Sequence, residues 1–527
     1  MMGSRSVEIF EPNRCACQQR DGVILTDFPP ARMRPFRGNA IAGWLLLMLP
    51  LMLLGGWATP VASAEGIPNG WPHFFAGQVD NLGDSNPLPD RWSPRDVTWS
   101  AALEGYGQSS PIVWRDTVFA TSVSGAEKED LRVTAVSLSD GSVKWVRVFR
   151  STAPETSGQL ISRAAPTPAC DEDGLFVFFE SGDLFALDHH GETRWHVSLA
   201  DRFGRFENKF GLAASPILTQ QAVIVLVDHD GPSYLAAFSR TDGSLLWKRD
   251  RPREGVDQQD GQRREPPNGR SWSSPALVHA AGRDHLVCSS AGSLVGYDPR
   301  SGETLWAHEE IGGNTVATPI DLGGGRFLVA SLIRPADGPT AYATESNLLA
   351  RIVEQEAGFR LQVEWVAEKA RGSFCSPVAS QDLAYWVNPT GVVFGIDLAT
   401  GEQRFSNRLP CGACWATPLV VGDRVYFFGK DGEATILKSS PEFELISTGH
   451  RTRDPDDRPD APVGEAAVAD DDTADEASGG EASAARRRVA ALNSGVTLYA
   501  AIRVGTHWIV RYGDRIDCLN FAVTPNR

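Results

Sequence analysis

Arg240-Thr-Asp-Gly-Ser-Leu-Leu-Trp247 is the stretch that decides the fold, because its pattern recurs along the chain. In every copy a glycine stands four residues before a large aromatic residue. A tight hairpin turn needs a residue with positive φ, which glycine adopts without Cβ strain. Each copy therefore predicts a hairpin whose second strand carries an aromatic wedge between neighbouring sheets. The other copies are Leu138–Trp145, Asp188–Trp195, Pro299–Trp306 and Leu398–Phe405.

A second element recurs upstream of these turns: a serine or threonine, then a proline that introduces an apolar strand. Proline lacks an amide hydrogen and is tolerated at the first residue of a strand, so each copy marks where a new sheet begins. Successive prolines lie 41 to 59 residues apart, which suits a four-stranded blade with its loops. The seven copies are Pro111, Pro168, Pro216, Pro275, Pro319, Pro377 and Pro418.

The two ends of the repeat region complete each other. Residues 97–102 have the pattern of a closing strand, whereas residues 496–503, 508–512 and 516–519 have the pattern of opening strands. Pairing of these N- and C-terminal strands would close the ring and remove the sheet edges. We therefore predict an all-β, eight-bladed β-propeller of four-stranded antiparallel blades over residues 69–525, with seven blades as the alternative.

Two repeats depart from the pattern, and one long insert interrupts it. The fifth repeat runs through Trp365 without the glycine turn, and the seventh has no aromatic wedge near Phe443. Residues 451–488 are rich in Asp, Glu, Ala and Gly and show no apolar periodicity. Such a segment cannot bury enough apolar area to offset its ordering entropy. We expect a disordered acidic insert in a surface loop, with a partner-binding tail as the functional alternative.

The N-terminus has the order of a secretory signal. Arg32, Arg34 and Arg37 precede an apolar run over residues 40–57, and small residues follow at 62–64. We interpret residues 1–64 as an N-terminal extension and signal peptide, with an uncleaved membrane anchor as the alternative. The rest of the chain is then exported, to the periplasm or cell envelope. The formal net charge of −16 argues against nucleic-acid binding, which needs clustered Lys and Arg.

The turn-and-tryptophan repeat resembles the tryptophan-docking repeat of pyrroloquinoline-quinone-type β-propellers. The resemblance covers about residues 69 to 525, and the lead-in Trp71-Pro-His-Phe-Phe-Ala-Gly is similar to that of many exported members. It implies one of two branches: quinoprotein dehydrogenases, which use the quinone and a calcium ion, or non-catalytic members similar to the outer-membrane assembly lipoprotein. The repeat identifies the fold and leaves the branch open.

The dehydrogenase branch implies two adjacent cysteines over the cofactor, a carboxylate base and oxygen ligands for calcium. The chain has no Cys-Cys pair; its nearest approach is Cys411-Gly-Ala-Cys414. Haem attachment would need C-x-x-C-H, but Trp415 follows Cys414. We expect no catalytic residues, no metal site and no cofactor, with pyrroloquinoline quinone (PQQ) and Ca2+ only under the alternative. For Cys411 and Cys414 themselves we favour a local disulfide; unpaired thiols and a redox or metal role stay open.

Loops that enter the first strand of each blade lie near a propeller's axis, where such folds usually hold ligands. Several cationic and polar residues fall just before the marking prolines, and we expect them to converge on one funnel. Cations there would suit an anionic ligand or the carboxylates of a peptide. The alternative is that each arginine pairs locally with a carboxylate or carbonyl. The candidate ligand-binding residues are Tyr106, Arg163, Lys209, Arg270, Asn314 and Arg371.

These observations favour an exported, non-catalytic propeller that acts as a scaffold for an unknown protein partner or a small anionic ligand. A PQQ-dependent dehydrogenase is the main alternative, and a polysaccharide-binding or hydrolytic propeller comes third. The dehydrogenase would need bound quinone and Ca2+, the scaffold a protein partner, and the hydrolase paired carboxylates in the funnel.

Overall fold

The computed structural model describes residues 70–75, 89–155, 162–208, 210–251, 271–290, 292–332, 342–453 and 497–521. The chain divides into the units Met1–Ser63 and Ala64–Arg527, and every described residue lies in the second. The interpretation of residues 1–64 as an extension and signal peptide therefore falls outside the described residues. So does most of the predicted acidic insert, because description stops at residue 453 and resumes at 497.

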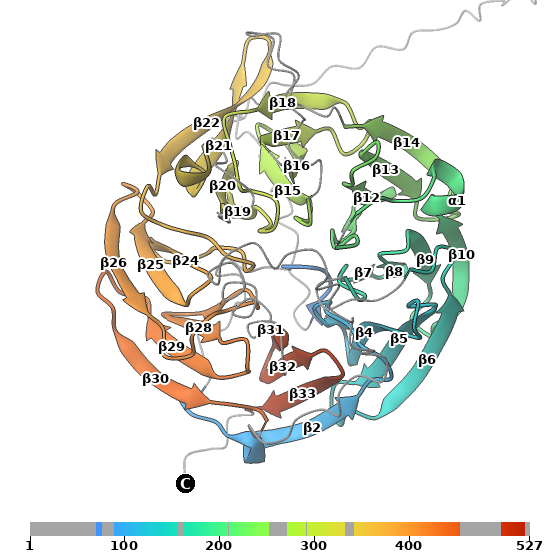
Figure 1. The fold of residues 1–527 in the computed structure, drawn as a ribbon, viewed down its shortest axis with the longest axis horizontal. Coiled ribbons are helices and arrows are strands. Elements are labelled where there is room, and N and C mark those ends of the chain that lie inside the picture. Colours follow the sequence, from blue (N-terminus) through green and yellow to red (C-terminus); the bar gives the residue numbers. More distant parts are fainter. Residues whose placement is uncertain are drawn as a thin grey trace, which may run out of the picture. The chain divides into compact units, whose positions relative to one another are not determined.

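Eight antiparallel sheets follow one another around a ring (Figure 1). Seven are consecutive along the chain, and we number these blades in chain order. Blade one contains β3 (Ile112–Trp114), β4 (Thr117–Ser124), β5 (Asp130–Ser137) and β6 (Val143–Arg150), and blade two contains β7 (Ala169–Asp171), β8 (Gly174–Phe178), β9 (Asp183–Leu187) and β10 (Thr193–Ser198). Blade three contains β11 (Ile217–Leu218), β12 (Ala222–Val227), β13 (Tyr234–Ser239) and β14 (Leu245–Asp250), and blade four contains β15 (Ala276–Ala280), β16 (Arg283–Ser290), β17 (Ser293–Tyr297) and β18 (Thr304–His308).

The next three blades repeat the arrangement, and the described residues also form one short α-helix and two 3-10 turns. Blades five to seven are β19 (Ile320–Gly323), β20 (Arg326–Val329), β21 (Leu348–Gln355) and β22 (Gly358–Val366); β23 (Val378–Ser380), β24 (Leu383–Val387), β25 (Val392–Asp397) and β26 (Gln403–Arg408); β27 (Leu419–Val421), β28 (Arg424–Phe428), β29 (Ala434–Lys438) and β30 (Leu445–His450). The helical elements are α1 (Leu199–Phe203), η1 (Pro94–Asp96) and η3 (Ala343–Glu345).

The eighth blade joins the two ends of the propeller. β31 (Leu498–Val504), β32 (His507–Tyr512) and β33 (Arg515–Asn520) come from the C-terminal side, and β2 (Val97–Ala102) supplies the outer strand. β2 runs antiparallel to β33, with Ala101 opposite Ile516. The predicted eight blades and their closure by N- and C-terminal strands are confirmed.

Burial explains why these segments form strands. The middle strands β8 and β9 are buried along their whole length, as expected for strands covered by neighbouring sheets on both faces. The outer strand β6 instead alternates between exposed and half-buried residues, so only one of its faces meets a neighbouring blade. Among the described residues, no helix is long and apolar enough to cross a membrane.

Of the five predicted aromatic wedges, Trp145, Trp195 and Trp247 dock on the next blade, whereas Trp306 and Phe405 lie over glycines of their own blades. With Trp99 and Trp365, which the repeat did not predict as wedges, a ring docks on the next blade at five junctions. At each of them the ring lies over the glycine turn of the next blade, whose φ is positive. At four of them the indole N–H also donates to a carbonyl of that turn, at 2.9 to 3.0 Å. The five pairs are Trp99 with Gly141, Trp145 with Gly191, Trp195 with Gly243, Trp247 with Gly302, and Trp365 with Gly401.

Candidate functional site: the channel mouth

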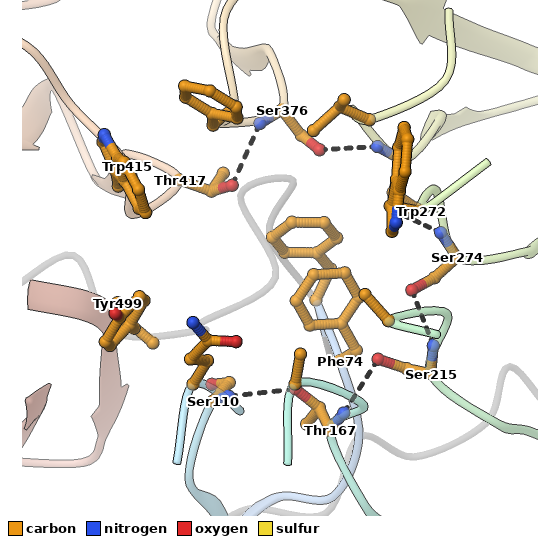
Figure 2. Close-up of a pocket in the computed structure, with 18 of the residues that line it drawn as sticks. Phe74, Ser110, Thr167, Ser215, Trp272, Ser274, Ser376, Trp415, Thr417 and Tyr499 are labelled. Carbon is orange, nitrogen blue, oxygen red and sulfur yellow. Dashed lines mark hydrogen bonds between the residues drawn. The ribbon is translucent and has the colours of Figure 1, made fainter. Parts of the chain in front are cut away.

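A belt of hydroxyl groups encircles the channel where the inner strands begin. At each step the backbone N–H of a serine or threonine that precedes proline donates to the hydroxyl oxygen of its counterpart in the next blade, as Figure 2 shows. The six bonds measure 2.9 to 3.1 Å. We call Ser110, Thr167, Ser215, Ser274, Thr318, Ser376 and Thr417 the hydroxyl belt.

The hydroxyl belt explains why this residue type precedes the marking prolines. A buried backbone N–H without a partner costs about 1–3 kcal/mol, and the inner strand cannot supply a partner at its first residue. A hydroxyl from the next blade satisfies the amide and ties the two blades together at the axis. The motif was predicted only as a strand start, so its second role was missed.

Inside the hydroxyl belt lies a cavity of about 250 Å³, which we call the mouth chamber. Aromatic side chains from several blades surround it: Trp272, Phe374, Trp415 and Tyr499. The Phe374 and Trp415 rings lie 5.0 Å apart, and those of Trp415 and Tyr499 lie 6.2 Å apart. Phe374 is 41% exposed, so part of its ring faces solvent at the mouth.

Two of the predicted site residues, Tyr106 and Arg163, come together beside the mouth chamber. The Arg163 guanidinium lies 4.1 Å from the centre of the Tyr106 ring, and the Tyr106 and Tyr499 hydroxyls are 2.8 Å apart. Burial, with Tyr499 close by, raises the pKa of Tyr106 far above its ordinary value, so the phenol stays neutral. Within the described part of the chain, Arg163 forms no ion pair and its Nε has no hydrogen-bond partner.

Asn314 instead bonds to two strands of the fourth blade, and Arg371 bonds within its own loop. Asn314 is fully buried and donates to Ser289 Oγ at 2.7 Å and to the Ser293 carbonyl at 3.0 Å. Arg371 donates through Nη1 to the carbonyls of Glu368 and Ala370. The local-pairing alternative therefore describes Arg371 well.

Lys209 and Arg270 lie outside the described residues. Convergence of all six residues on one ligand stays a prediction.

Cys411 and Cys414 lie in the loop between β26 and β27 as buried free thiols. The backbone N–H of Cys411 donates to Thr435 Oγ1 at 3.1 Å, which fixes the loop against the seventh blade. A hydrogen bond between the two thiols lowers the pKa of Cys411 and raises that of Cys414. The predicted local disulfide stays a prediction. Among the residues placed by the structure, no group of three or more His, Cys, Asp or Glu side chains could hold a metal ion.

The N-terminal segment 70–75 crosses the channel. Its short strand β1 (Gly70–Trp71) adds to the inner edge of β3 as a fifth strand, and the Pro72 carbonyl accepts from the Cys170 N–H at 2.8 Å. Trp71 is buried in the cluster that joins the first, seventh and eighth blades. Phe74 then lies within the hydroxyl belt, as Figure 2 shows.

Phe74 also borders a second cavity of about 320 Å³, which we call the far chamber because it follows the inner strands beyond their prolines. The far chamber carries two titratable side chains, His73 and Asp321. Burial lowers the pKa of His73 and raises the pKa of Asp321. The described lining of the mouth chamber, in contrast, has Tyr499 as its sole titratable side chain.

A family model described as outer membrane protein assembly factor BamB matches residues 93–210 and 204–407. The solved structure of BamB from Moraxella catarrhalis is similar, with a TM-score of 0.51 and 15% identity, covering 82% of this chain and 99% of that one. Quinohemoprotein alcohol dehydrogenase from Comamonas testosteroni gives a TM-score of 0.50 and 12% identity, covering 88% of this chain and 83% of that one. At these identities the structures show a shared fold.

No curated protein matches the sequence significantly. The family model spans more than half of the sequence, and the eight blades agree with it. The chain therefore belongs to the family described as outer membrane protein assembly factor BamB, within the pyrroloquinoline-quinone-type β-propellers.

Proposed function

We propose that this chain is an exported, non-catalytic scaffold of the cell envelope that binds a segment of a partner protein at the channel mouth. One observation carries the proposal: the described lining of the mouth chamber combines aromatic rings with hydroxyl groups and offers no carboxylate, imidazole or amine. Aromatic side chains dominate the energetics of binding surfaces, whereas acid–base catalysis most often uses an imidazole, a carboxylate or an amine within reach of the substrate.

The family supports this choice. The matching model is described as an assembly factor, and the similar structure from Moraxella catarrhalis is a BamB protein. The N-terminal sequence, with its basic residues, apolar run and small residues, supports export. These two observations together support a periplasmic or envelope location.

The described residues fit a quinone and a calcium ion poorly. The mouth chamber of about 250 Å³ is smaller than the ~300–1,000 Å³ of sites for drug-sized ligands. Calcium takes six to eight oxygen ligands, mostly carboxylates and carbonyls, and the described lining of the mouth chamber holds no carboxylate. The proposed function therefore involves no quinone chemistry.

Site-directed photo-crosslinking tests the scaffold. A benzoylphenylalanine replaces Phe374 at the mouth in one variant and Val146 on the outer strand β6 in a second, matched variant. The two positions are 41% and 42% exposed, so they differ in location and hardly in accessibility. Irradiation in intact cells should give a discrete protein adduct from position 374 and none from 146. Equal adducts from both positions, or none from 374, would contradict a partner site at the mouth.

A cofactor assay on the purified chain distinguishes the scaffold from the dehydrogenase alternative. PQQ and Ca2+ are added, and binding is followed by calorimetry and dye-linked oxidation of an alcohol and sugar panel. We expect neither heat of binding nor turnover. Tight quinone binding with turnover would contradict the scaffold proposal and support the dehydrogenase.

A further inference from the structure

Phe74 lies where the mouth chamber meets the far chamber. Its ring lines both the mouth chamber and the far chamber, so a segment that enters from the mouth meets an aromatic floor. The floor is held firmly from both ends. Trp71 is 1% exposed on one side, and on the other Phe75 packs against the cluster that contains Ala317 and Ile320.

The backbone also supports this placement. Phe75 has a φ of 55°, in the left-handed region that a residue with a Cβ adopts only when its surroundings hold it there. The ring centroids of Phe74 and Phe75 lie 3.9 Å apart. The surrounding contacts thus fix where the Phe74 ring lies.

The size of the mouth chamber limits what it accepts. At about 250 Å³ it is below the range for a whole drug-sized ligand, yet it is lined by rings on its sides and on its floor. Aromatic pairs prefer offset or edge-to-face arrangements and contribute ~0.5–1.5 kcal/mol beyond the area they bury. The lining therefore matches one aromatic side chain better than a threaded segment or a flexible aliphatic one.

The charge at the edge of the chamber indicates what flanks that side chain. Arg163 stacks on Tyr106 next to the mouth and forms no ion pair with any described carboxylate. Lys430 lies 5.5 Å over the Trp415 ring on another side of the mouth. In a protein with a net charge of −16, a guanidinium that forms no ion pair with a described carboxylate favours an acidic partner at this opening.

We propose that Phe74 is the specificity-determining residue of the mouth: it makes the chamber a blind pocket for one aromatic side chain of an extended partner segment, with neighbouring carboxylates on Arg163. This inference rests on the proposed scaffold function and names the chemistry of its partner. Backbone groups of the partner segment stay at the mouth, and its aromatic ring lies against the Phe74 ring.

Two synthetic peptides test the inference on the purified chain. The first, acetyl-Gly-Glu-Trp-Glu-Gly-amide, carries the expected side chain; the second replaces tryptophan by the longer biphenylalanine. Binding is measured by fluorescence anisotropy for the natural chain and for Phe74→Ala. Phe74→Ala should lower the affinity for the tryptophan peptide about 3- to 10-fold, because one aromatic pair is lost. It should raise the affinity for the biphenylalanine peptide, because the longer side chain gains room. A purely structural effect of the substitution would weaken both peptides alike and overturn the proposal.

Two further variants complete the test. Phe74→Leu keeps most of the packing volume and loses the ring, so it should weaken the tryptophan peptide even if Phe74→Ala fails to fold. Arg163→Gln should lower the affinity for the tryptophan peptide, which carries two glutamates, about 3-fold. It should leave the affinity for a peptide with Gln in place of Glu unchanged. Val146→Ala serves as the control and should bind as the natural chain does.

The outcomes separate this inference from the scaffold itself. A natural chain that binds a leucine peptide as tightly as the tryptophan peptide, while position 374 still gives a protein adduct, overturns the aromatic pocket and retains the scaffold. Absence of both peptide binding and adduct overturns both proposals.

Discussion

Seven of the eight junctions between blades carry an aromatic ring in one of two positions, and the difference shows how the ring depends on the glycine turn. At five junctions the aromatic ring lies over the glycine turn of the next blade. Trp306 and Phe405 instead lie over glycines of their own blades, Gly296 and Gly395. Trp306 is 4% exposed, so the alternative position buries its ring at least as well.

The residue opposite the ring explains which arrangement a blade adopts. Gly296 and Gly395 stand directly opposite Trp306 and Phe405 in the sheet, and they leave room for the ring. At the docked rings the same place holds a larger residue, such as Ala237 opposite Trp247. The blades that follow Trp306 and Phe405 also lack the glycine turn. Where a blade lacks the glycine turn, the blade before it has a glycine directly opposite its aromatic ring.

Removal of a docked ring is the strongest test of this comparison. Trp195→Ala deletes a ring that is 9% exposed and lies over Gly243, together with its indole hydrogen bond to the Arg240 carbonyl. We expect a loss of about 3–5 kcal/mol, because a large side chain leaves a cavity between two blades. Urea unfolding followed by circular dichroism measures it. A loss below about 1 kcal/mol would show that the wedge contributes little.

Gly296→Ala tests the second kind of junction. A Cβ there would lie 2.1 Å from the Trp306 ring, so the ring must move. We expect destabilisation by about 1–3 kcal/mol from overpacking, although alanine is ordinarily the better residue in a strand. Thermal unfolding measures the change. The double variant with Trp306→Leu should recover much of the loss, and a stabilising effect of Gly296→Ala alone would refute the ring position.

Two conservative replacements sharpen the comparison among docked rings. Trp195 donates its indole N–H at 3.0 Å, whereas Nε1 of Trp247 has no partner among the described residues. Trp195→Phe leaves a carbonyl unpaired, and Trp247→Phe relieves an unsatisfied donor. The first should therefore cost about 1 kcal/mol more than the second in urea unfolding. Equal costs would mean that the indole bond contributes nothing.

The smallest expected effect concerns pH. Asp397 begins the turn on which Trp365 docks, and it accepts from Arg404 and from the Thr400 N–H. These donors, Arg404 first, lower the pKa of Asp397 to about 2 from 3.8. Because the folded pKa lies below the unfolded one, the stabilisation is complete above about pH 4 and is lost as the pH falls toward 2. Asp397→Asn should remove this part of the pH dependence in thermal unfolding, by less than about 1 kcal/mol at an exposed pair.

Most of the fold could be predicted because each blade repeats local signals. The glycine turns, the strand-starting prolines and the matching ends at Val97 and residues 496–519 are all visible along the chain. The exceptions at Trp306 and Phe405 could not be predicted, since the choice depends on a glycine opposite the ring and on a turn in another blade.

The site was less accessible to sequence reasoning. Tyr106 and Arg163 do come together, but Asn314 bonds to β16 and β17 and Arg371 bonds within its own loop, and the sequence shows neither pairing. Phe74 was missed because nothing in Trp71-Pro-His-Phe-Phe shows that the segment returns through the channel. One signal was present for the hydroxyl belt: all seven prolines follow serine or threonine.

The closure of the eighth blade has a consequence for the timing of synthesis. Ser100 in β2 and Asp517 in β33 share a hydrogen bond across 417 positions of the sequence. At ~5–20 residues per second, the ribosome needs roughly 20 to 80 s to travel between them. Throughout that interval β2 has no partner strand and presents an open edge to other chains. The edge of β2 is therefore covered only after β33 has been synthesised.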